Sequence, residues 1–117
     1  MSKSYVQITG DINQGMKKFR QAQPDAMAGF SSMAQAAMAP GALSAKQKEL
    51  IALAIGVAGH CDGCIGFHAK ALARLQASRA ELMETLAVAV YMGGGPSLMF
   101  ASDAIAAYEE FGGEAAS

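Results

Sequence analysis

The chain has 117 residues, a formal net charge of −1 and 16% charged residues. A domain of this length buries roughly two-thirds of the surface that its unfolded chain exposes, so it needs no metal or disulfide to form a core. The Lys and Arg residues are scattered, so the sequence indicates no nucleic-acid partner. The longest apolar run, residues 50–59, is too short to cross a membrane and predicts a buried helix.

The amino-acid content favours helices over strands. The chain is rich in Ala, Leu and Met, and no segment alternates with a period of two. We therefore expect an all-α fold of about six helices, in a single domain over residues 1–117. The first ten residues, MSKSYVQITG, have no apolar signal core, so we expect a cytoplasmic protein. Thiols are kept reduced there, and a close cysteine pair is then more often catalytic or metal-binding than structural.

The first three predicted helices follow from capping residues. The first starts near Asp11 and carries INQGMKKFRQA. Pro24, a favourable first helical residue, opens the second, which ends before APG at positions 39–41. Ser44 with Gln47 forms a capping box for the third, which ends at Gly59.

The last three predicted helices complete the domain. The fourth carries CDGCIGFHAKALARLQA, and Ser78 with Glu81 forms a capping box for the fifth, RAELMETLAVAVYM. The segment GGGP at 93–96 breaks the chain; we interpret it as a turn, because no Lys-Ser/Thr follows it as in a phosphate-binding loop. The sixth helix, SLMFASDAIAAYEEF, ends at Gly112.

The segment HCDGCIGFH holds both cysteines and both histidines of the chain. Cys61, Cys64 and His68 have offsets of 0, 3 and 7, which place them on one face of a helix. Leu72 and Leu75 continue this face, so we expect it to point inward. In the first helical turn, unpaired N–H groups favour a thiolate, and such settings lower a thiol pKa from about 8.5 to roughly 3.5–7.5. His68, one turn after Cys64, is placed to accept the proton of that thiol.

Three interpretations of this segment remain open from spacing alone. A redox dithiol would cycle between two thiols and a disulfide. A zinc site would use Cys61, Cys64 and His68, with Glu49 or His60 as the fourth ligand. Buried structural thiols are the third interpretation.

The third predicted helix contributes one further candidate, Glu49. It shares a stripe with Leu53, Gly56 and His60. Glycine inside a helix costs about 1 kcal/mol relative to alanine, so Gly56 predicts the close approach of a neighbouring helix, such as the cysteine helix. Glu49 would then face His68, directly or through a water, and fix the imidazole tautomer. The alternative is that KQKE forms a solvated first turn.

The segment ELIALAIGVAGHCDGCIGFH has Glu, eleven residues, Cys, two residues, Cys, three residues and His. This pattern resembles the signature of the alkylhydroperoxidase D-like branch of the carboxymuconolactone decarboxylase family. The likeness covers about residues 43–111 and includes the MGGGP break. It implies an all-α fold and assembly into homotrimers or homohexamers. The decarboxylase branch lacks the cysteine pair, which argues against decarboxylation.

The resemblance also implies a role for each site residue. Cys64 matches the thiol that attacks a peroxide, Cys61 the resolving thiol, His68 the base, and Glu49 the carboxylate that completes a proton relay. The disulfide would be reduced by a lipoyl-bearing or thioredoxin-like dithiol protein, and electrons would pass to a peroxiredoxin. No further cofactor is implied. Gly63 stands where the best-known members have a second histidine.

The sequence therefore predicts a thiol-dependent oxidoreductase that reduces hydroperoxides or disulfides. His60, beside Cys61, is an accessory candidate at a position that the family pattern does not match. The alternative is a non-catalytic zinc-binding or structural oligomeric module. Methionines recur in the first two predicted helices, where they are interpreted as core filling or, more specifically, as an oligomer contact; they are Met16, Met27, Met33 and Met38.

Overall fold

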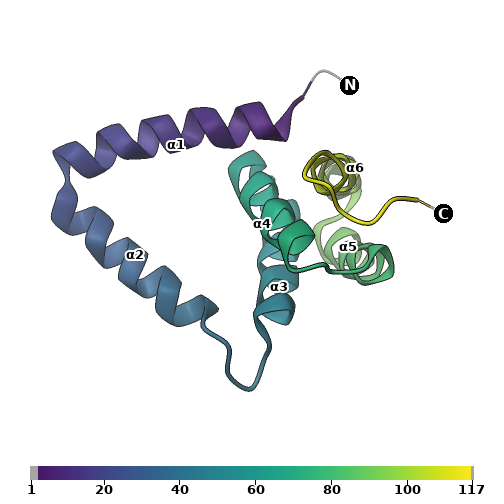
Figure 1. Cartoon of the computed structure of the whole chain (residues 1–117). Coiled ribbons are helices and arrows are strands. Elements are labelled where there is room, and N and C mark those ends of the chain that lie inside the picture. Colours follow the sequence, from purple (N-terminus) through teal and green to yellow (C-terminus); the bar gives the residue numbers. More distant parts are fainter. Residues whose placement is uncertain (1–2, 117) are drawn as a thin grey trace.

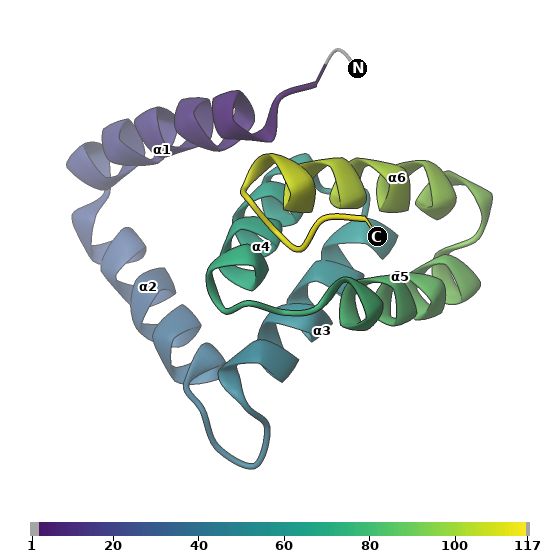
Figure 2. The ribbon, with the colours of Figure 1, turned by 45° about the vertical axis from the view of Figure 1, so that its right-hand side comes forward.

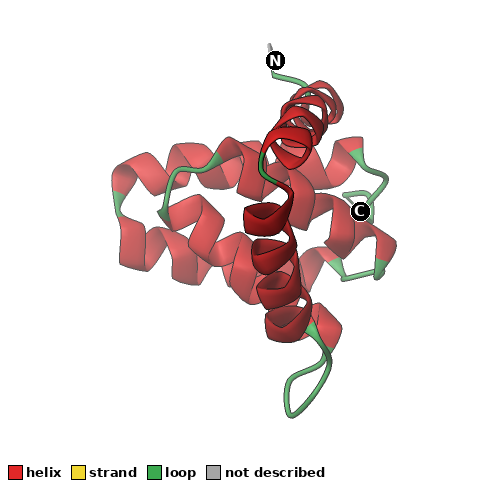
Figure 3. Ribbon diagram, turned by 90° about the vertical axis from the view of Figure 1, so that its left-hand side faces the viewer, coloured by secondary structure: helices red, strands yellow, loops and turns green. Residues whose placement is uncertain are grey.

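The computed structural model describes residues 3–116 and confirms the all-α prediction. Its six helices are α1 (Tyr5–Ala22), α2 (Pro24–Met38), α3 (Ala45–Ala58), α4 (Asp62–Arg74), α5 (Arg79–Gly93) and α6 (Gly95–Glu110). Within the described residues there is no strand, and the connections between helices are short (Figure 3). None of these helices is both long enough and apolar enough to cross a membrane.

Helices α3 to α6 pack together as a four-helix bundle, which holds most of the core (Figure 2). Its large buried side chains come from all four helices and include Leu53, Ile65, Leu72, Leu82 and Tyr108, each with no exposed surface. Removing such a side chain from water contributes about 1.5–3 kcal/mol to folding. The bundle therefore fixes α3 and α4, the two helices that carry the cysteines and their neighbours.

Both predicted capping boxes are confirmed. Ser44 Oγ accepts the Gln47 N–H at 3.0 Å, and Gln47 Oε1 accepts the Ser44 N–H at 2.8 Å. Ser78 and Glu81 make the same reciprocal pair at 3.1 and 2.8 Å. These bonds satisfy N–H groups that a helix leaves unpaired at its start, so α3 and α5 begin where the sequence predicted.

The predicted start of the first helix, near Asp11, is wrong by six residues. Helix α1 begins at Tyr5, with Ser4 as its N-cap accepting the Gln7 N–H at 3.2 Å. Glu110, at the end of α6, accepts the Tyr5 N–H and the Ser4 hydroxyl, both at 2.6 Å. The Ser4 hydroxyl holds the pKa of the Glu110 carboxyl below its usual value. The Ser4 cap is a local signal that the prediction overlooked, whereas the Glu110 contacts come from the far end of the sequence, where no local pattern indicates them.

Helices α1 and α2 form an arm that extends away from the bundle (Figure 1). The start of α1 packs on α4, whereas α2 has no buried residue. Phe30 is 61% exposed and Met33 is 63% exposed. Core filling is therefore wrong for Met33 within one chain.

The apolar run at residues 50–59 is buried on one side only. Leu53 and Val57 have no exposed surface, but Ile51 is 47% and Ile55 is 67% exposed. The prediction of a buried helix is thus wrong for the outer face of α3. Together with Met38 and Leu43, the two isoleucines line an apolar hollow of about 300 Å³ between α2 and α3.

Candidate functional site

The cysteine pair lies where the chain turns from α3 into α4. Cys61 is the N-cap of α4, and its sulfur is bonded to the sulfur of Cys64, with 5.3 Å between the two Cα atoms. Cys61 Sγ also accepts the backbone N–H of Cys64 at 3.2 Å. The protein thus has a C-x-x-C disulfide at a helix N-terminus, the setting that favours a thiolate when the bond is reduced.

A tight corner before Cys61 fixes its position. The Cys61 N–H donates to Gly56 O at 2.9 Å, and the His60 N–H donates to Val57 O at 3.2 Å. These two bonds form a Schellman motif, in which one residue adopts the left-handed conformation that usually selects glycine. Here that residue is His60, with φ of 56°. Gly59, the predicted end of the helix, is its C-cap.

The side chain of His60 lies against α6. Its ring stacks on Phe100, with centroids 4.7 Å apart and planes within 5° of parallel. Its Nε2 atom lies 3.3 Å from the hydroxyl of Ser97, which is fully buried. These contacts help to offset the left-handed backbone, so His60 joins the cysteine corner to the sixth helix.

Gly56 allows α3 to approach the cysteine helix closely. A Cβ atom at position 56 would lie 2.8 Å from Cβ of Cys64, closer than real Cβ atoms approach one another. The close approach expected from the sequence is therefore present. This approach also brings the part of α3 that carries Glu49 next to α4.

Glu49 and His68 form a hydrogen-bonded pair across this contact. Glu49 Oε2 lies 2.6 Å from His68 Nδ1, and the two side chains are 17% and 29% exposed. An ionised carboxylate only accepts hydrogen bonds, so Nδ1–H is the donor and Nε2 is left as the basic nitrogen. The pair is half-buried and not part of a solvated turn, and His68 lies one helical turn after Cys64.

The inward face predicted for α4 is correct at Leu72 and wrong at Leu75. Leu72 has no exposed surface, whereas Leu75 is 42% exposed. The helix ends at Arg74, and the Ala77 N–H bonds to Leu72 O around Gln76, a second left-handed residue with φ of 59°. The early end of the helix turns Leu75 toward solvent.

Helix α1 covers another face of the cysteine helix, which the sequence did not indicate. A Cβ at Gly63 would lie 2.9 Å from Cδ1 of Ile12, and one at Gly66 would lie 2.6 Å from Cγ2 of Thr9. A histidine at position 63, as in the best-known family members, would require the end of the Ile12 side chain to shift. Tyr5 is 1% exposed and packs on the same face.

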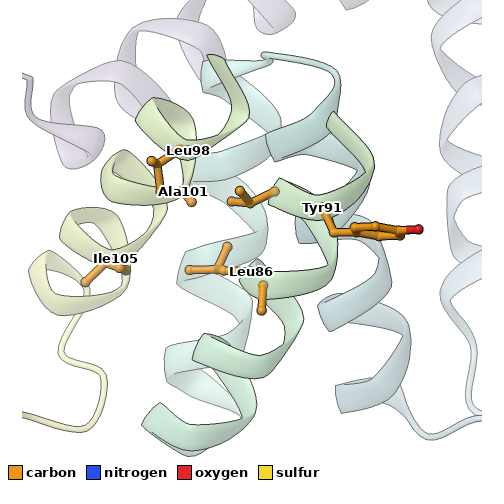
Figure 4. A pocket seen from close by; sticks show the side chains of 7 residues that line it. Leu86, Tyr91, Leu98, Ala101 and Ile105 are labelled. Carbon is orange, nitrogen blue, oxygen red and sulfur yellow. The ribbon is translucent and has the colours of Figure 1, made fainter. Parts of the chain in front are cut away.

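The hollow of about 470 Å³ between α5 and α6 contains none of these residues. Its walls are apolar and come from α5 and α6, with Leu86, Tyr91, Leu98, Ala101 and Ile105 among them (Figure 4). Across residues 3–116, no three His, Cys, Asp or Glu side chains are grouped so that they hold a metal ion. The cysteine corner is therefore the site at which the described residues gather reactive groups.

Comparisons with known proteins agree with this architecture. Residues 24–107 match the profile of the carboxymuconolactone decarboxylase family. The chain is 59% identical to a carboxymuconolactone decarboxylase family protein from Legionella pneumophila, whose apo crystal structure superposes with a TM-score of 0.90 over 92% of this chain and 96% of that one.

Two relatives are uncharacterized proteins. One, from Cupriavidus necator, is 43% identical over 85% of this chain and 88% of its own length. The other, uncharacterized protein 4 in the cox locus of Paracoccus denitrificans, is 33% identical over 72% of this chain and 76% of its own. The extent of these matches, together with the six-helix fold, shows that the chain belongs to the carboxymuconolactone decarboxylase family.

Proposed function

We propose that the protein is an alkylhydroperoxidase D-like thiol oxidoreductase, which reduces hydroperoxides through the Cys61–Cys64 pair. The observation that carries the proposal is the disulfide at the start of α4 with the Glu49–His68 pair one turn further along. A dithiol beside an oriented base is the arrangement that nucleophilic cysteine chemistry requires.

The proposed reaction starts with the reduced protein. His68, oriented by Glu49, takes the proton of the Cys64 thiol, and the thiolate attacks one peroxide oxygen. The S–O bond forms as the O–O bond breaks, and the alkoxide leaves with the electron pair and takes a proton, giving an alcohol and a sulfenic acid. Cys61 then attacks the Cys64 sulfur, releases water and leaves the disulfide.

An external dithiol must then reduce the disulfide and restore both thiols. A lipoyl-bearing or thioredoxin-like protein has the required chemistry, and a peroxiredoxin is a candidate acceptor of electrons from the reduced pair. We propose that the active form is a homotrimer or homohexamer. Exposed apolar side chains on α2 and in the hollow between α5 and α6 support self-association.

Mass spectrometry of the reduced protein, before and after one equivalent of hydroperoxide, tests the proposal. We expect the loss of two hydrogens per chain, no metal in a native spectrum of protein purified without chelator, and an oligomer of three or six chains. Cys64→Ser should abolish peroxide consumption, and Cys61→Ser should trap an oxidised Cys64. Full turnover by Cys64→Ser, or one zinc per chain and no fast disulfide, would overturn it in favour of the zinc-binding module.

A further inference from the structure

Asp62 stands between the two cysteines, as the first residue of α4. A carboxylate at this place competes with a thiolate for the same unpaired N–H groups, because both are acceptors at a helix N-terminus. In the structure the two acceptors have different donors. Asp62 Oδ1 accepts from the Tyr5 hydroxyl at 2.8 Å and from Lys3 Nζ at 3.1 Å, whereas Cys61 Sγ accepts the Cys64 N–H.

Tyr5 is built into the fold as a fixed donor. It is 1% exposed, and its ring lies against the backbone of α4 at Gly66. Burial, and then the hydrogen bond to Asp62, raise the pKa of the phenol, so the hydroxyl keeps its proton. The Tyr5 backbone N–H is itself held by Glu110 of α6. Both the ring and the backbone of Tyr5 are therefore held in place.

Lys3 balances the charge of Asp62. Its ammonium bridges Asp62 and, at 2.8 Å, Asp103 of α6, and it lies 5.2 Å from the centre of the Phe100 ring. The hydrogen bond to Asp103 is the main reason that the pKa of Lys3 is raised, so it stays protonated. Among residues 3–116, the ion pairs around the first turn of α4 join Lys3 to Asp62 and to Asp103, and the Glu49–His68 pair lies on the side of α3.

We propose that Tyr5 and Lys3 are positioning residues for the dithiol: they hold the Asp62 carboxylate against α1 and so leave the N-terminal N–H groups of α4 to the sulfur of Cys61. This inference rests on the proposed function, in which Cys61 attacks the sulfenic acid. In that step the Cys61–Cys64 bond forms, the S–O bond breaks, and hydroxide leaves with the electron pair and takes the proton that the Cys61 thiol has released. An ionised Cys61 is the nucleophile, and N–H donors that face it favour that form.

The thiol–disulfide equilibrium with dithiothreitol, at mildly alkaline pH, measures this effect without peroxide. A stabilised thiolate favours the reduced protein, so Tyr5→Phe should shift the equilibrium toward the disulfide by roughly three- to tenfold. Lys3→Gln should shift it in the same direction. Because Lys3 is partly exposed, this second variant tests the inference even if Tyr5→Phe folds poorly. Asp62→Asn, which removes the competing charge, should shift it the opposite way.

A double-mutant cycle separates positioning from packing. In the Asp62→Asn background, Tyr5→Phe should have no further effect on the equilibrium. Tyr108→Phe is the matched control, because it also removes a tyrosine hydroxyl that donates a hydrogen bond inside the protein. That hydroxyl donates to Ala77 O at 2.6 Å, and Ala77 is not part of α4. The equilibrium of Tyr108→Phe should equal that of the wild type.

Two results would overturn the inference. One is a Tyr5→Phe shift that is no larger than that of Tyr108→Phe, and the other is a shift that persists in the Asp62→Asn background. Peroxide consumption by the wild type is measured in parallel. If the wild type consumes no peroxide but Tyr5→Phe still shifts the thiol–disulfide equilibrium, the proposed function is rejected and the positioning role stands. If the wild type consumes peroxide but Tyr5→Phe leaves the equilibrium unchanged, the positioning role is rejected and the proposed function stands.

Discussion

Helices α1 and α2 are neighbours in the chain, but they differ in what they bury. The first two turns of α1 place Tyr5 and Thr9 against the cysteine helix, and both residues are at least 96% buried. Helix α2 has a higher mean hydropathy than α1 yet contains no buried residue. Burial therefore depends on whether the chain supplies a partner surface, and not on how apolar a helix is.

Glycines show the same difference at atomic scale. At Gly56, Gly63 and Gly66, an added Cβ would lie within 2.9 Å of a side chain on another helix. At Gly15 and Gly29, in the arm, it would meet nothing within 4 Å. The glycines around the cysteines allow helices to touch, and those in the arm have no such role within one chain.

The largest effect on the reaction should come from a substitution where helices pack around the cysteines. Glu49→Gln keeps the shape of the side chain but removes the charge that orients His68, so the rate at which peroxide oxidises Cys64 should fall about 10- to 100-fold. Stopped-flow measurement of the single-turnover rate tests this. Glu84→Gln, on the exposed face of α5, is the control and should react like the wild type. An unchanged rate for Glu49→Gln would remove Glu49 from the proposed relay.

Local sequence was enough to predict much of this site. Capping boxes, the C-x-x-C spacing and the cost of Gly56 are all short-range signals, and they located α3, α4 and their close contact. For Glu49, the pattern left a contact with His68 and a solvated turn open; the resemblance to the family favoured the contact, which the structure contains. Each of these predictions used residues that are within 20 positions of one another.

The covering of the cysteine helix by α1 was not predictable in the same way. Tyr5 and Asp62 are 57 residues apart, and Tyr5 and Glu110 are 105 apart. No local pattern marks either pair, because the contacts depend on how α1 folds back on α4 and α6. For the apolar residues of α2 the sequence left core filling and an oligomer contact open, because either use gives the same local pattern; the structure leaves them outside the core.

Gly56→Ala should destabilise the bundle at the contact between α3 and α4. The added methyl would force apart the backbones of α3 and α4 at Cys64, and overpacking of this kind costs about 1–3 kcal/mol. Urea unfolding of the reduced protein, at a fixed protein concentration, measures the loss. A variant as stable as the wild type would show that the two helices separate easily, and would weaken the argument that Gly56 holds the site together.

The exposed side of α2 gives the third prediction. Replacing both Phe30 and Met33 with Ser should weaken self-association, because exposed apolar side chains of this kind are the anchors of protein interfaces. We expect about 1–3 kcal/mol at the interface, read from sedimentation equilibrium. Unfolding of the dissociated chain should change by less than about 0.5 kcal/mol, since neither residue is buried within it. If the double variant assembles like the wild type, the interface between copies does not involve this side of α2.

The smallest effect, and the one opposite in sign, belongs to Gly29→Ala. The position is inside α2, and a Cβ there meets nothing within 4 Å, so the methyl has room. Alanine loses less backbone entropy than glycine when a helix forms, and the gain is about 0.5–1 kcal/mol in the free energy of unfolding. The same urea experiment applied to Gly56→Ala and Gly29→Ala should give changes of opposite sign. A loss of stability at Gly29 in the assembled protein, but not in the dissociated chain, would instead show that a second copy approaches α2 as closely as α3 approaches α4.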